Sequence, residues 1–197
     1  MNFDRVEQAL TRARFHCHRF ATGQDAAQWL AAECSGKTVG IGGSMTAKAM
    51  KLEELLPRTS TVYWHWLTPG PETLANAATA QVYLTSVNAL AETGELINID
   101  GTGNRVASMI FGPKNVALII GKNKFAETMD ECMDRIKAVA GAKNAQRLGL
   151  STPCAVAGRC TDCFSKERIC SVTTIIEAKS GAISEMHLIL VDEVLGY

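Results

Sequence analysis

Four cysteines stand close together near the end of the chain, in the spacing C-x5-C-x2-C-x6-C; they are Cys154, Cys160, Cys163 and Cys170. The central C-x2-C pair can place two thiolates on one ion, and four thiolates suit tetrahedral zinc or an iron–sulfur cluster. The nearby cations Arg159, Lys166 and Arg168 would favour thiolates and balance their charge. The stretch therefore predicts a four-cysteine metal site. The alternatives are a redox or disulfide role for Cys160 and Cys163, or reduced thiols with a structural role.

A glycine-rich turn, GIGGS, follows a short run of β-forming residues and precedes a helical pattern; its candidate binding residues are Gly42, Gly43 and Ser44. In α/β proteins such a turn lets the backbone approach an anion, and the next helix offers free N–H groups and the positive end of its dipole. Met45 occupies the place of the third glycine of the dinucleotide fingerprint, so that motif is not matched. The turn is a candidate ligand contact, with a tight turn capped by Ser44 as the alternative.

A second glycine-rich stretch, SVNALAETGELINIDGTGNR, holds two turns on either side of a short strand. In the first turn, Glu92, Thr93 and Gly94 place a carboxylate at the edge of a strand, where it can act as a base or a nucleophile. The second turn offers backbone N–H groups, a hydroxyl and a guanidinium to a phosphate or carboxylate. Its residues are Asp100, Gly101, Thr102, Gly103, Asn104 and Arg105. The alternative is a pair of ordinary β-turns with a surface arginine.

Three further polar residues lie in or after predicted strands. His65 stands between Trp64 and Trp66, so strand alternation places both tryptophans on one face and His65 on the other. Lys122 and Lys124 follow an apolar strand, and the carboxyl ends of strands are where open α/β sheets bind ligands. We expect a packed or solvated histidine and solvated lysines, with ligand contact as the alternative in each case.

The composition is that of an ordinary globular protein, with 197 residues, 47% hydrophobic and 20% charged, and a formal net charge of zero. This is the size of one domain, predicted over residues 1–197, and the charge gives no reason to expect a nucleic acid or a membrane surface as partner. The first residues, MNFDRVEQALTRARFHCHRF, lack the apolar segment of a signal peptide, which predicts a cytoplasmic protein. There, an odd number of cysteines disfavours a disulfide framework.

Helices and strands are predicted to alternate, which favours an α/β sandwich with a mostly parallel sheet. Apolar residues at helical spacing predict helices over Asp4–His18, Asp25–Cys34, residues 45–56, Glu72–Ala78 and residues 125–139. β-Forming runs predict strands over Thr38–Ile41, Ser60–Trp66, Gln81–Ser86, Glu95–Ile99, Val106–Phe111 and Asn115–Gly121. The last of these is apolar throughout, as expected for a central strand buried on both faces.

The two ends of the chain carry separate predictions. Residues 1–36 are expected to form N-terminal helices, and residues 151–170 a cysteine-rich loop without periodicity. A loop of that length in a compact domain has a functional or a structural reason. Two further strands, residues 171–178 and 186–193, are joined by a turn and are expected to pair as an antiparallel hairpin at the sheet edge.

Several of these segments, taken together, resemble the LUD (lactate utilisation) domain family. They are GIGGSMT, SVNALAETGELINIDGTGNRVAS, TPCAVAGRCTDCFSKERIC and the terminal ILVDEVLGY, in that order along the chain. The resemblance implies a Rossmann-like three-layer sandwich of the sugar-phosphate isomerase and CoA-transferase type. It also implies a part in the conversion of L-lactate to pyruvate beside iron–sulfur partner subunits, which places an iron–sulfur cluster ahead of zinc for the cysteines.

The wider superfamily gives roles to the second glycine-rich stretch. Glu92-Thr93-Gly94 is similar to the Glu-x-Gly motif of CoA transferases, whose glutamate is the nucleophile, although Thr93 stands where the transferases tend to carry asparagine. The loop from Asp100 to Arg105 resembles the loop that contacts phosphate in the isomerases. The resemblance thus implies Glu92 as a catalytic candidate and a small anionic metabolite as ligand.

Three functions remain open at this level. The first is a subunit or accessory factor of lactate oxidation beside iron–sulfur oxidoreductase subunits. The second is a free-standing enzyme that acts on a phosphorylated or CoA-linked metabolite through Glu92 and the glycine loops. The third is a scaffold or regulatory domain stapled by a metal, without catalysis. A homodimer is possible in each case, because homo-oligomers are common among such folds.

Overall fold

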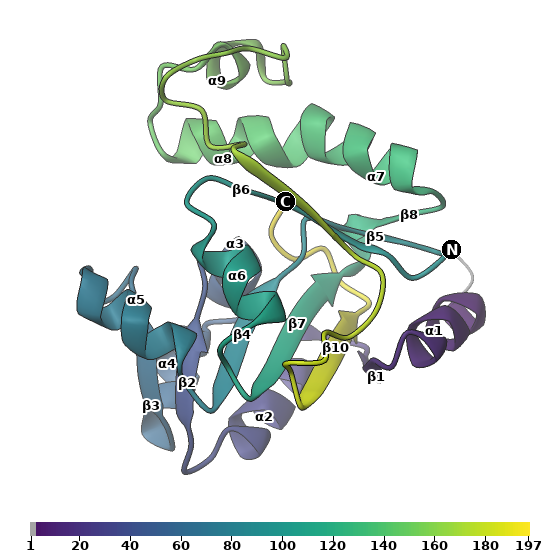
Figure 1. Ribbon diagram of the computed structural model, residues 1–197. Helices are drawn as coiled ribbons and strands as arrows, with labels where there is room; N and C mark the ends of the chain where they lie inside the picture. Colours follow the sequence, from purple (N-terminus) through teal and green to yellow (C-terminus); the bar gives the residue numbers. More distant parts are fainter. Residues whose placement is uncertain (1–2) are drawn as a thin grey trace.

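The computed structural model describes residues 3–197, and two β-sheets form its frame (Figure 1). Strands of the larger sheet pair in parallel, in the order β1 (His16–Phe20), β10 (Glu185–Val191), β7 (Asn115–Gly121), β4 (Val82–Ser86), β2 (Thr38–Ile41) and β3 (Thr61–Trp64). The smaller sheet has the order β8 (Phe125–Ala126), β5 (Ala89–Ala91), β6 (Leu96–Asp100) and β9 (Val172–Ile176). In it β8 and β5 are parallel, and the other pairs are antiparallel.

Helical segments lie between and outside the sheets. They are α1 (Phe3–Arg12), α2 (Gly23–Glu33), α3 (Met45–Ala49), α4 (Leu52–Leu55), η1 (Leu56–Arg58), α5 (Pro71–Ala78), α6 (Asn104–Ile110), η2 (Lys122–Lys124), α7 (Met129–Arg135), the π-helical η3 (Ile136–Ala140), α8 (Gly141–Arg147) and α9 (Pro153–Ala157). Apolar residues of α2, α3 and α4 pack on one face of the larger sheet. Those of α1, α5 and α6 pack on the other face together with the smaller sheet. The outer face of the smaller sheet is covered by α7 and η3. The predicted α/β sandwich is confirmed.

The central strands show why the larger sheet is buried on both faces. Along β10, Leu188 and Leu190 belong to the apolar cluster on one face, and Ile189 and Val191 to the cluster on the other. Strand β7 alternates in the same way between the two clusters. A strand covered on both faces needs apolar side chains at every position. The predicted central position of Asn115–Gly121 is therefore confirmed.

The prediction that residues 1–36 are helical was wrong in its middle part. Helix α1 ends at Arg12, Arg14 has a left-handed backbone with φ of 65°, and His16–Phe20 then forms strand β1. Each residue of β1 has a partner on β10 in the parallel register. The helical spacing of the preceding residues continued by chance to Cys17, and pairing with a neighbouring strand outweighed it.

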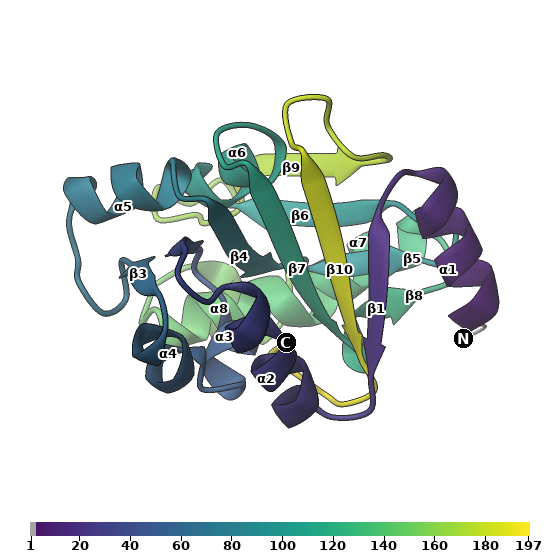
Figure 2. The ribbon, with the colours of Figure 1, turned by 90° about the horizontal axis from the view of Figure 1, so that it is seen from below.

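Two predictions of strands were also wrong. Val106–Phe111 was expected to be a strand, but helix α6 occupies Asn104–Ile110 and buries Val106 and Met109, which lie on one helical face. The hairpin expected at the end of the chain does not form: β9 pairs with β6 in the smaller sheet, and β10 lies between β1 and β7 in the larger one (Figure 2). The apolar run of β10 requires cover on both faces, and an edge hairpin would leave one strand edge of it exposed.

Two predicted helices are broken or shifted. The helix expected over residues 45–56 is interrupted at Lys51, which has a left-handed backbone with φ of 53°. The helix expected over residues 125–139 starts instead at Met129, after the capping box formed by Thr128 and Glu131, and continues through η3 and α8 to Arg147. The region of residues 151–170 is irregular as predicted, apart from the short helix α9.

Candidate functional site

A cavity of about 350 Å³ lies where several strands of the larger sheet end. Its wall includes Gly43 and Ser44 after β2, Trp66 after β3, Ser86 at the end of β4, and Lys124 after β7. Residues of β6, of η3 and α8, and of the loop that carries the cysteines complete the wall. The carboxyl ends of parallel strands are the usual binding edge of an open α/β sheet. The cavity is therefore the candidate binding site.

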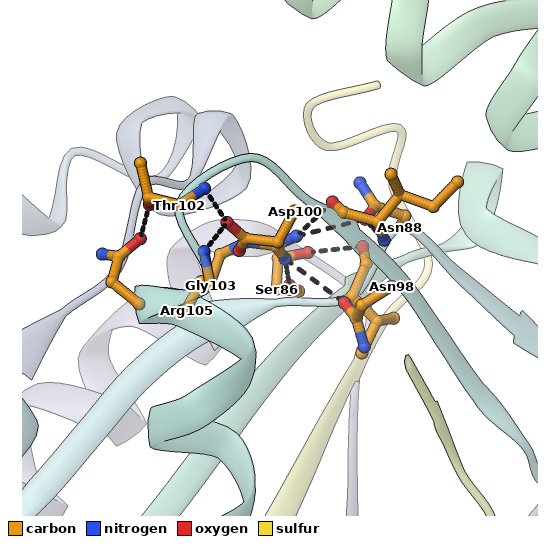
Figure 3. A network of polar contacts seen from close by, with 10 residues as sticks. Ser86, Asn88, Asn98, Asp100, Thr102, Gly103 and Arg105 are labelled. Carbon is orange, nitrogen blue, oxygen red and sulfur yellow. Dashed lines mark hydrogen bonds and ion pairs between the residues drawn. The ribbon is translucent and has the colours of Figure 1, made fainter. Parts of the chain in front are cut away.

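The buried or nearly buried polar residues at one side of the cavity are called the floor; they are Ser86, Asn88, Asn98, Asp100, Arg105 and Lys124. Arg105 forms hydrogen bonds or an ion pair with several of them (Figure 3). Its Nη1 donates to Ser86 O at 2.7 Å and to Asn98 Oδ1 at 3.2 Å. Its Nη2 donates to Asn88 Oδ1 at 3.1 Å and to Ile99 O at 3.0 Å. Its Nε pairs with Asp100 Oδ2 at 3.2 Å. All five N–H groups of the guanidinium thus have protein acceptors, so Arg105 would act on a ligand through its charge and through the loops that it fixes.

Asp100 gives the loop after β6 its shape. One of its carboxylate oxygens, Oδ1, accepts from Thr102 N at 3.1 Å and from Gly103 N at 2.9 Å, while Oδ2 faces Arg105 (Figure 3). The Thr102 hydroxyl donates to Asn104 Oδ1 at 2.6 Å. Gly103 takes the left-handed conformation, with φ of 83°, that starts α6. The predicted loop from Asp100 to Arg105 lies at the cavity, and two of its amides are already used by Asp100.

Lys124 is buried at the cavity wall with 3% of its surface exposed, so the expectation of a solvated side chain was wrong for this lysine. Its Nζ contacts Ser86 Oγ at 2.6 Å, Thr46 Oγ1 at 2.8 Å and Val87 O at 3.1 Å. These acceptors are two hydroxyls and a carbonyl, none of them a carboxylate. Burial, and then the nearby charges of Arg135 and Arg105, lower the pKa of Lys124 well below its ordinary value.

Lys122, two residues earlier, makes a useful comparison. Its Nζ lies 3.4 Å from Asp192 Oδ1, and both side chains are about half exposed. It is the solvated lysine that the sequence predicted. The short helix η2 turns Lys122 outward and Lys124 inward, so two lysines in the same turn have different surroundings.

The cavity wall carries more cations than carboxylates. Its charged residues are Asp100, Arg105, Lys124, Lys137, Arg147 and Arg168. Asp100 is neutralised by Arg105, and Lys137 has a carboxylate partner outside the cavity wall, Asp162 at 3.0 Å. The remaining positive charge favours an anionic ligand.

Two aromatic side chains, Trp66 and Tyr197, form another part of the cavity wall. Trp66 stacks on the buried Trp64 with ring centroids 5.5 Å apart, and the Arg147 guanidinium lies over the Trp66 ring at 4.7 Å. Arg147 Nε also donates to the Tyr197 hydroxyl at 3.0 Å. His65 lines the same cavity, and its buried Nδ1 has no hydrogen-bond partner among residues 3–197; burial lowers the pKa of His65 below the ordinary value. Burial therefore favours the neutral form of the His65 imidazole.

The first glycine turn supports the cavity in two ways. Gly43 and Ser44 line it, and Ser44 caps α3 by accepting from Ala47 N at 3.1 Å. Gly42 lies behind the wall, where a Cβ would stand 2.6 Å from the Tyr83 hydroxyl. The turn thus brings Gly43 and Ser44 to the site and leaves Gly42 as the residue that allows close packing beneath it.

Glu92, Thr93 and Gly94 lie elsewhere. They form the turn between β5 and β6, which is not part of the cavity wall. Glu92 N donates to Ala126 O at 2.9 Å, and Gly94 packs against Ala9 of α1. The structure does not bring this turn to the other predicted site residues, and a catalytic role for Glu92 stays a prediction.

All four predicted metal ligands line the same cavity. Each of these cysteines is a half-buried free thiol. Cys154 Sγ lies 3.2 Å from Thr152 Oγ1, and Cys160 Sγ accepts from Asp162 N at 3.4 Å. The donors are of the kind that zinc or an iron–sulfur cluster uses, but within residues 3–197 no three Cys, His, Asp or Glu side chains gather as a ready coordination shell. The metal site stays a prediction.

The sequence did not single out several residues of this site. For Lys124 the sequence favoured a solvated side chain, with ligand contact as the alternative, and it gave no prediction for Arg147 or Tyr197. The position of Lys124 after a central strand was the available signal, because that is where ligands bind.

None of the helices described between residues 3 and 197 is long and apolar enough to cross a membrane.

Comparison with known proteins agrees with the architecture. The family model of the LUD domain matches residues 3–191. Among solved structures, the crystal structure of a DUF162 family protein from Deinococcus radiodurans is similar, with a TM-score of 0.58 and 13% identity, over 96% of this chain and 95% of that chain. At that identity the similarity concerns the fold alone. A comparison with curated proteins finds no match.

Proposed function

The chain belongs to the LUD domain family, and from that premise we propose that its cavity binds a small carboxylate of the lactate–pyruvate class. In this role the protein serves lactate oxidation as a subunit or accessory factor beside iron–sulfur oxidoreductase subunits. The observation that carries the proposal is the buried Lys124, whose hydrogen-bond acceptors at the cavity wall include no carboxylate.

A bound carboxylate would supply the negative charge that the cavity wall does not offer to the Lys124 ammonium. Burying an ammonium without a counter-ion is costly, and a carboxylate within contact distance favours the charged form. Arg147 and Arg168 lie on the same wall and add to the attraction for an anion. Trp66 and Tyr197 hold Arg147 in place at the aromatic side of the cavity, so a positive charge is available to an anion there as well.

The size of the cavity favours a small ligand. A volume of about 350 Å³ is at the low end for small-molecule sites, which range from roughly 300 to 1,000 Å³. A CoA thioester would have to extend far outside it. The turn that carries Glu92 is not part of this wall either. The geometry therefore supports a small anionic metabolite better than covalent CoA transfer.

The test is calorimetric titration of the purified full-length chain with L-lactate, pyruvate, inorganic phosphate and CoA. We expect L-lactate or pyruvate to bind and Lys124→Met to weaken that binding at least about tenfold, which is the loss of one charge-assisted hydrogen bond. Lys122→Met is the matched control and should bind as the wild type does, because Lys122 is half exposed and faces Asp192. Binding of phosphate or CoA alone, or of no ligand, would contradict the proposal.

The four thiols support a second role, in which a bound metal cross-links the loop that carries them; this is called the metal staple. We propose that Cys154, Cys160, Cys163 and Cys170 supply thiolates to an iron–sulfur cluster, or to zinc. Either metal, when bound, would fix residues 151–170, and a cluster would also carry electrons. The test is anaerobic purification followed by an absorbance spectrum and analysis for iron, sulfide and zinc. Metal below one equivalent, or metal retained when Cys160 and Cys163 are both replaced by serine, would contradict this role.

A further inference from the structure

The surroundings of Lys124 differ from those of a lysine that serves only as a charge. Its Nζ is buried among Ser86, Thr46 and Val87 at 2.6–3.1 Å, it faces the cavity, and the nearest charges that act on it are the cations Arg105 and Arg135. Arg135 itself donates to the carbonyls of Asn123 and Asn88. These neighbours disfavour an ammonium before a ligand arrives.

A neutral amine fits the contacts that are present. The neutral form has two N–H groups and one lone pair, whereas three oxygen atoms surround Nζ. Two of the contacts remain donations from Nζ, and a hydroxyl of Ser86 or Thr46 can turn to donate to the lone pair. Burial lowers the pKa of Lys124, which agrees with this arrangement and favours the neutral amine, the form that can act as a nucleophile.

We propose that Lys124 captures the carbonyl group of a 2-oxo acid in the cavity as a reversible imine. This inference rests on the proposed function, since the same cavity must first admit a small carboxylate. It narrows the ligand to the oxidised member of the lactate–pyruvate class, because L-lactate has a hydroxyl in place of the carbonyl and cannot form an imine.

The step balances without an oxidant or a reductant. The lone pair of Nζ forms a C–N bond with the carbonyl carbon, and the carbonyl oxygen takes up protons and leaves as water. Both protons come from the neutral amine, which loses its two N–H bonds as the C=N bond forms, and the hydroxyls of Ser86 and Thr46, which both contact Nζ, are placed to pass them. The carboxylate of the same ligand would meet the positive wall that includes Arg147 and Arg168. Addition of water reverses the step and releases the 2-oxo acid.

The experiment is reductive trapping. The full-length chain is incubated at neutral pH with pyruvate and sodium cyanoborohydride, and the product is analysed by intact mass and peptide mapping. We expect one reduced pyruvate adduct, on Lys124, in the wild type and in Lys122→Met. Lys124→Met should give no adduct, and L-lactate should give none with any variant. Peptide mapping of the wild type identifies the modified lysine even where a Lys124 variant fails to fold.

Binding measured without the reductant separates the two proposals. If calorimetry shows that pyruvate binds but trapping labels only exposed lysines such as Lys122, the imine is wrong and the proposed function stands. If pyruvate and L-lactate neither bind nor label Lys124, both proposals are wrong. If a larger 2-oxo acid such as 2-oxobutyrate labels Lys124 and pyruvate does not, the imine is supported and the ligand class is shifted.

Discussion

The floor and the cover of the cavity are built in opposite ways. The floor, defined as Ser86, Asn88, Asn98, Asp100, Arg105 and Lys124, is buried or nearly so and is joined by hydrogen bonds within the protein. The cover, defined as residues 151–170, holds four free thiols, and its short helix α9 has no buried residue. Val156 is 86% exposed and Phe164 is 93% exposed on the cover.

This difference indicates what each part can do alone. Most polar groups of the floor have partners within the protein, with Asn98 Nδ2 as an exception, so the floor is largely formed before a ligand arrives, and preorganisation of this kind favours binding. The contacts that hold the cover to the rest of the protein include hydrogen bonds from Cys160 N to Lys137 O and from Gln146 Nε2 to Ala155 O, both at 2.9 Å. Its thiols and exposed apolar side chains leave it able to gain order from a metal or a partner protein. Four predictions test this difference between the floor and the cover, from the largest expected effect to the smallest.

Replacing Arg105 by methionine should have the largest effect. The variant loses the ion pair between Arg105 and Asp100, so the buried carboxylate of Asp100 is left without a counter-ion. Breaking a buried ion pair in this way lowers the free energy of unfolding by about 3–5 kcal/mol. Urea denaturation followed by circular dichroism measures the free energy of unfolding. The control on the cover is Arg168→Met, whose side chain donates to Cys170 O and is exposed. If both variants lose the same stability, the contrast between floor and cover is wrong.

Gly42→Ala should have the next largest effect, because it adds a methyl group beneath the floor. The new Cβ would stand 2.6 Å from the Tyr83 hydroxyl, 3.0 Å from Thr85 Oγ1 and 3.1 Å from Arg105 Cγ. Such overpacking costs about 1–3 kcal/mol. Thermal unfolding measures the loss, and Gly181→Ala is the matched control, because a Cβ at Gly181 meets no atom within 4 Å. An unchanged melting temperature in Gly42→Ala would show that the atoms around the new methyl group move aside at little cost, which would contradict the prediction.

Lys124→Met should stabilise the protein at neutral pH by about 0.5–2 kcal/mol, the usual range for a single stabilising substitution. Since the pKa of Lys124 is lowered on folding, the unfolded chain binds a proton that the folded chain lacks. This makes the stability of the wild type rise with pH in the window between the folded pKa and the ordinary value of 10.5.

The measurement is urea denaturation of Lys124→Met and the wild type between about pH 7 and pH 8.5. The cysteines begin to titrate in this range, but both proteins carry them, so their contribution cancels in the difference between the two. The stability advantage of the variant should shrink as pH rises. Lys122→Met, as control, should keep the pH slope of the wild type. A variant that is less stable at every pH would indicate that the hydrogen bonds of Nζ outweigh its desolvation.

The smallest effect is expected on the cover. Replacing Cys160 and Cys163 by serine should change the free energy of unfolding of metal-free protein by less than about 0.5 kcal/mol, because these thiols are half-buried and the hydroxyl of serine can replace the weak contacts of Cys160 with Asp162. Denaturation in the presence of a chelator measures this. In metal-loaded protein the same pair of changes should cause a large loss. An equal effect with and without metal would contradict the metal staple.

The sequence was informative where a local pattern and the final environment agree. The apolar run Asn115–Gly121 predicted a central strand, and β7 is buried on both faces. The two glycine-rich turns after Ile41 and Ile99 predicted ligand loops, and both reach the cavity. The motifs also predicted the family correctly.

The failures occur where distant segments decide the outcome. His16–Phe20 carries a helical spacing but becomes a strand because β10 lies beside it. Val106–Phe111 has β-forming residues but becomes a helix that buries Val106 and places Met109 in the apolar cluster under the larger sheet. Short segments have weak intrinsic preferences, so packing with partners far away in sequence outweighs them.

What the sequence by itself determined is therefore the α/β class, the family and the turns that lie at the cavity, because periodicity and glycine content are local properties. Only the tertiary structure decided that the four cysteines share a cavity with those turns, and that Lys124 points inward while Lys122 points outward. The physical reason is that burial and charge depend on which strands become neighbours. The same lysine is an ordinary cation in water and a candidate nucleophile beside Arg105 and Arg135.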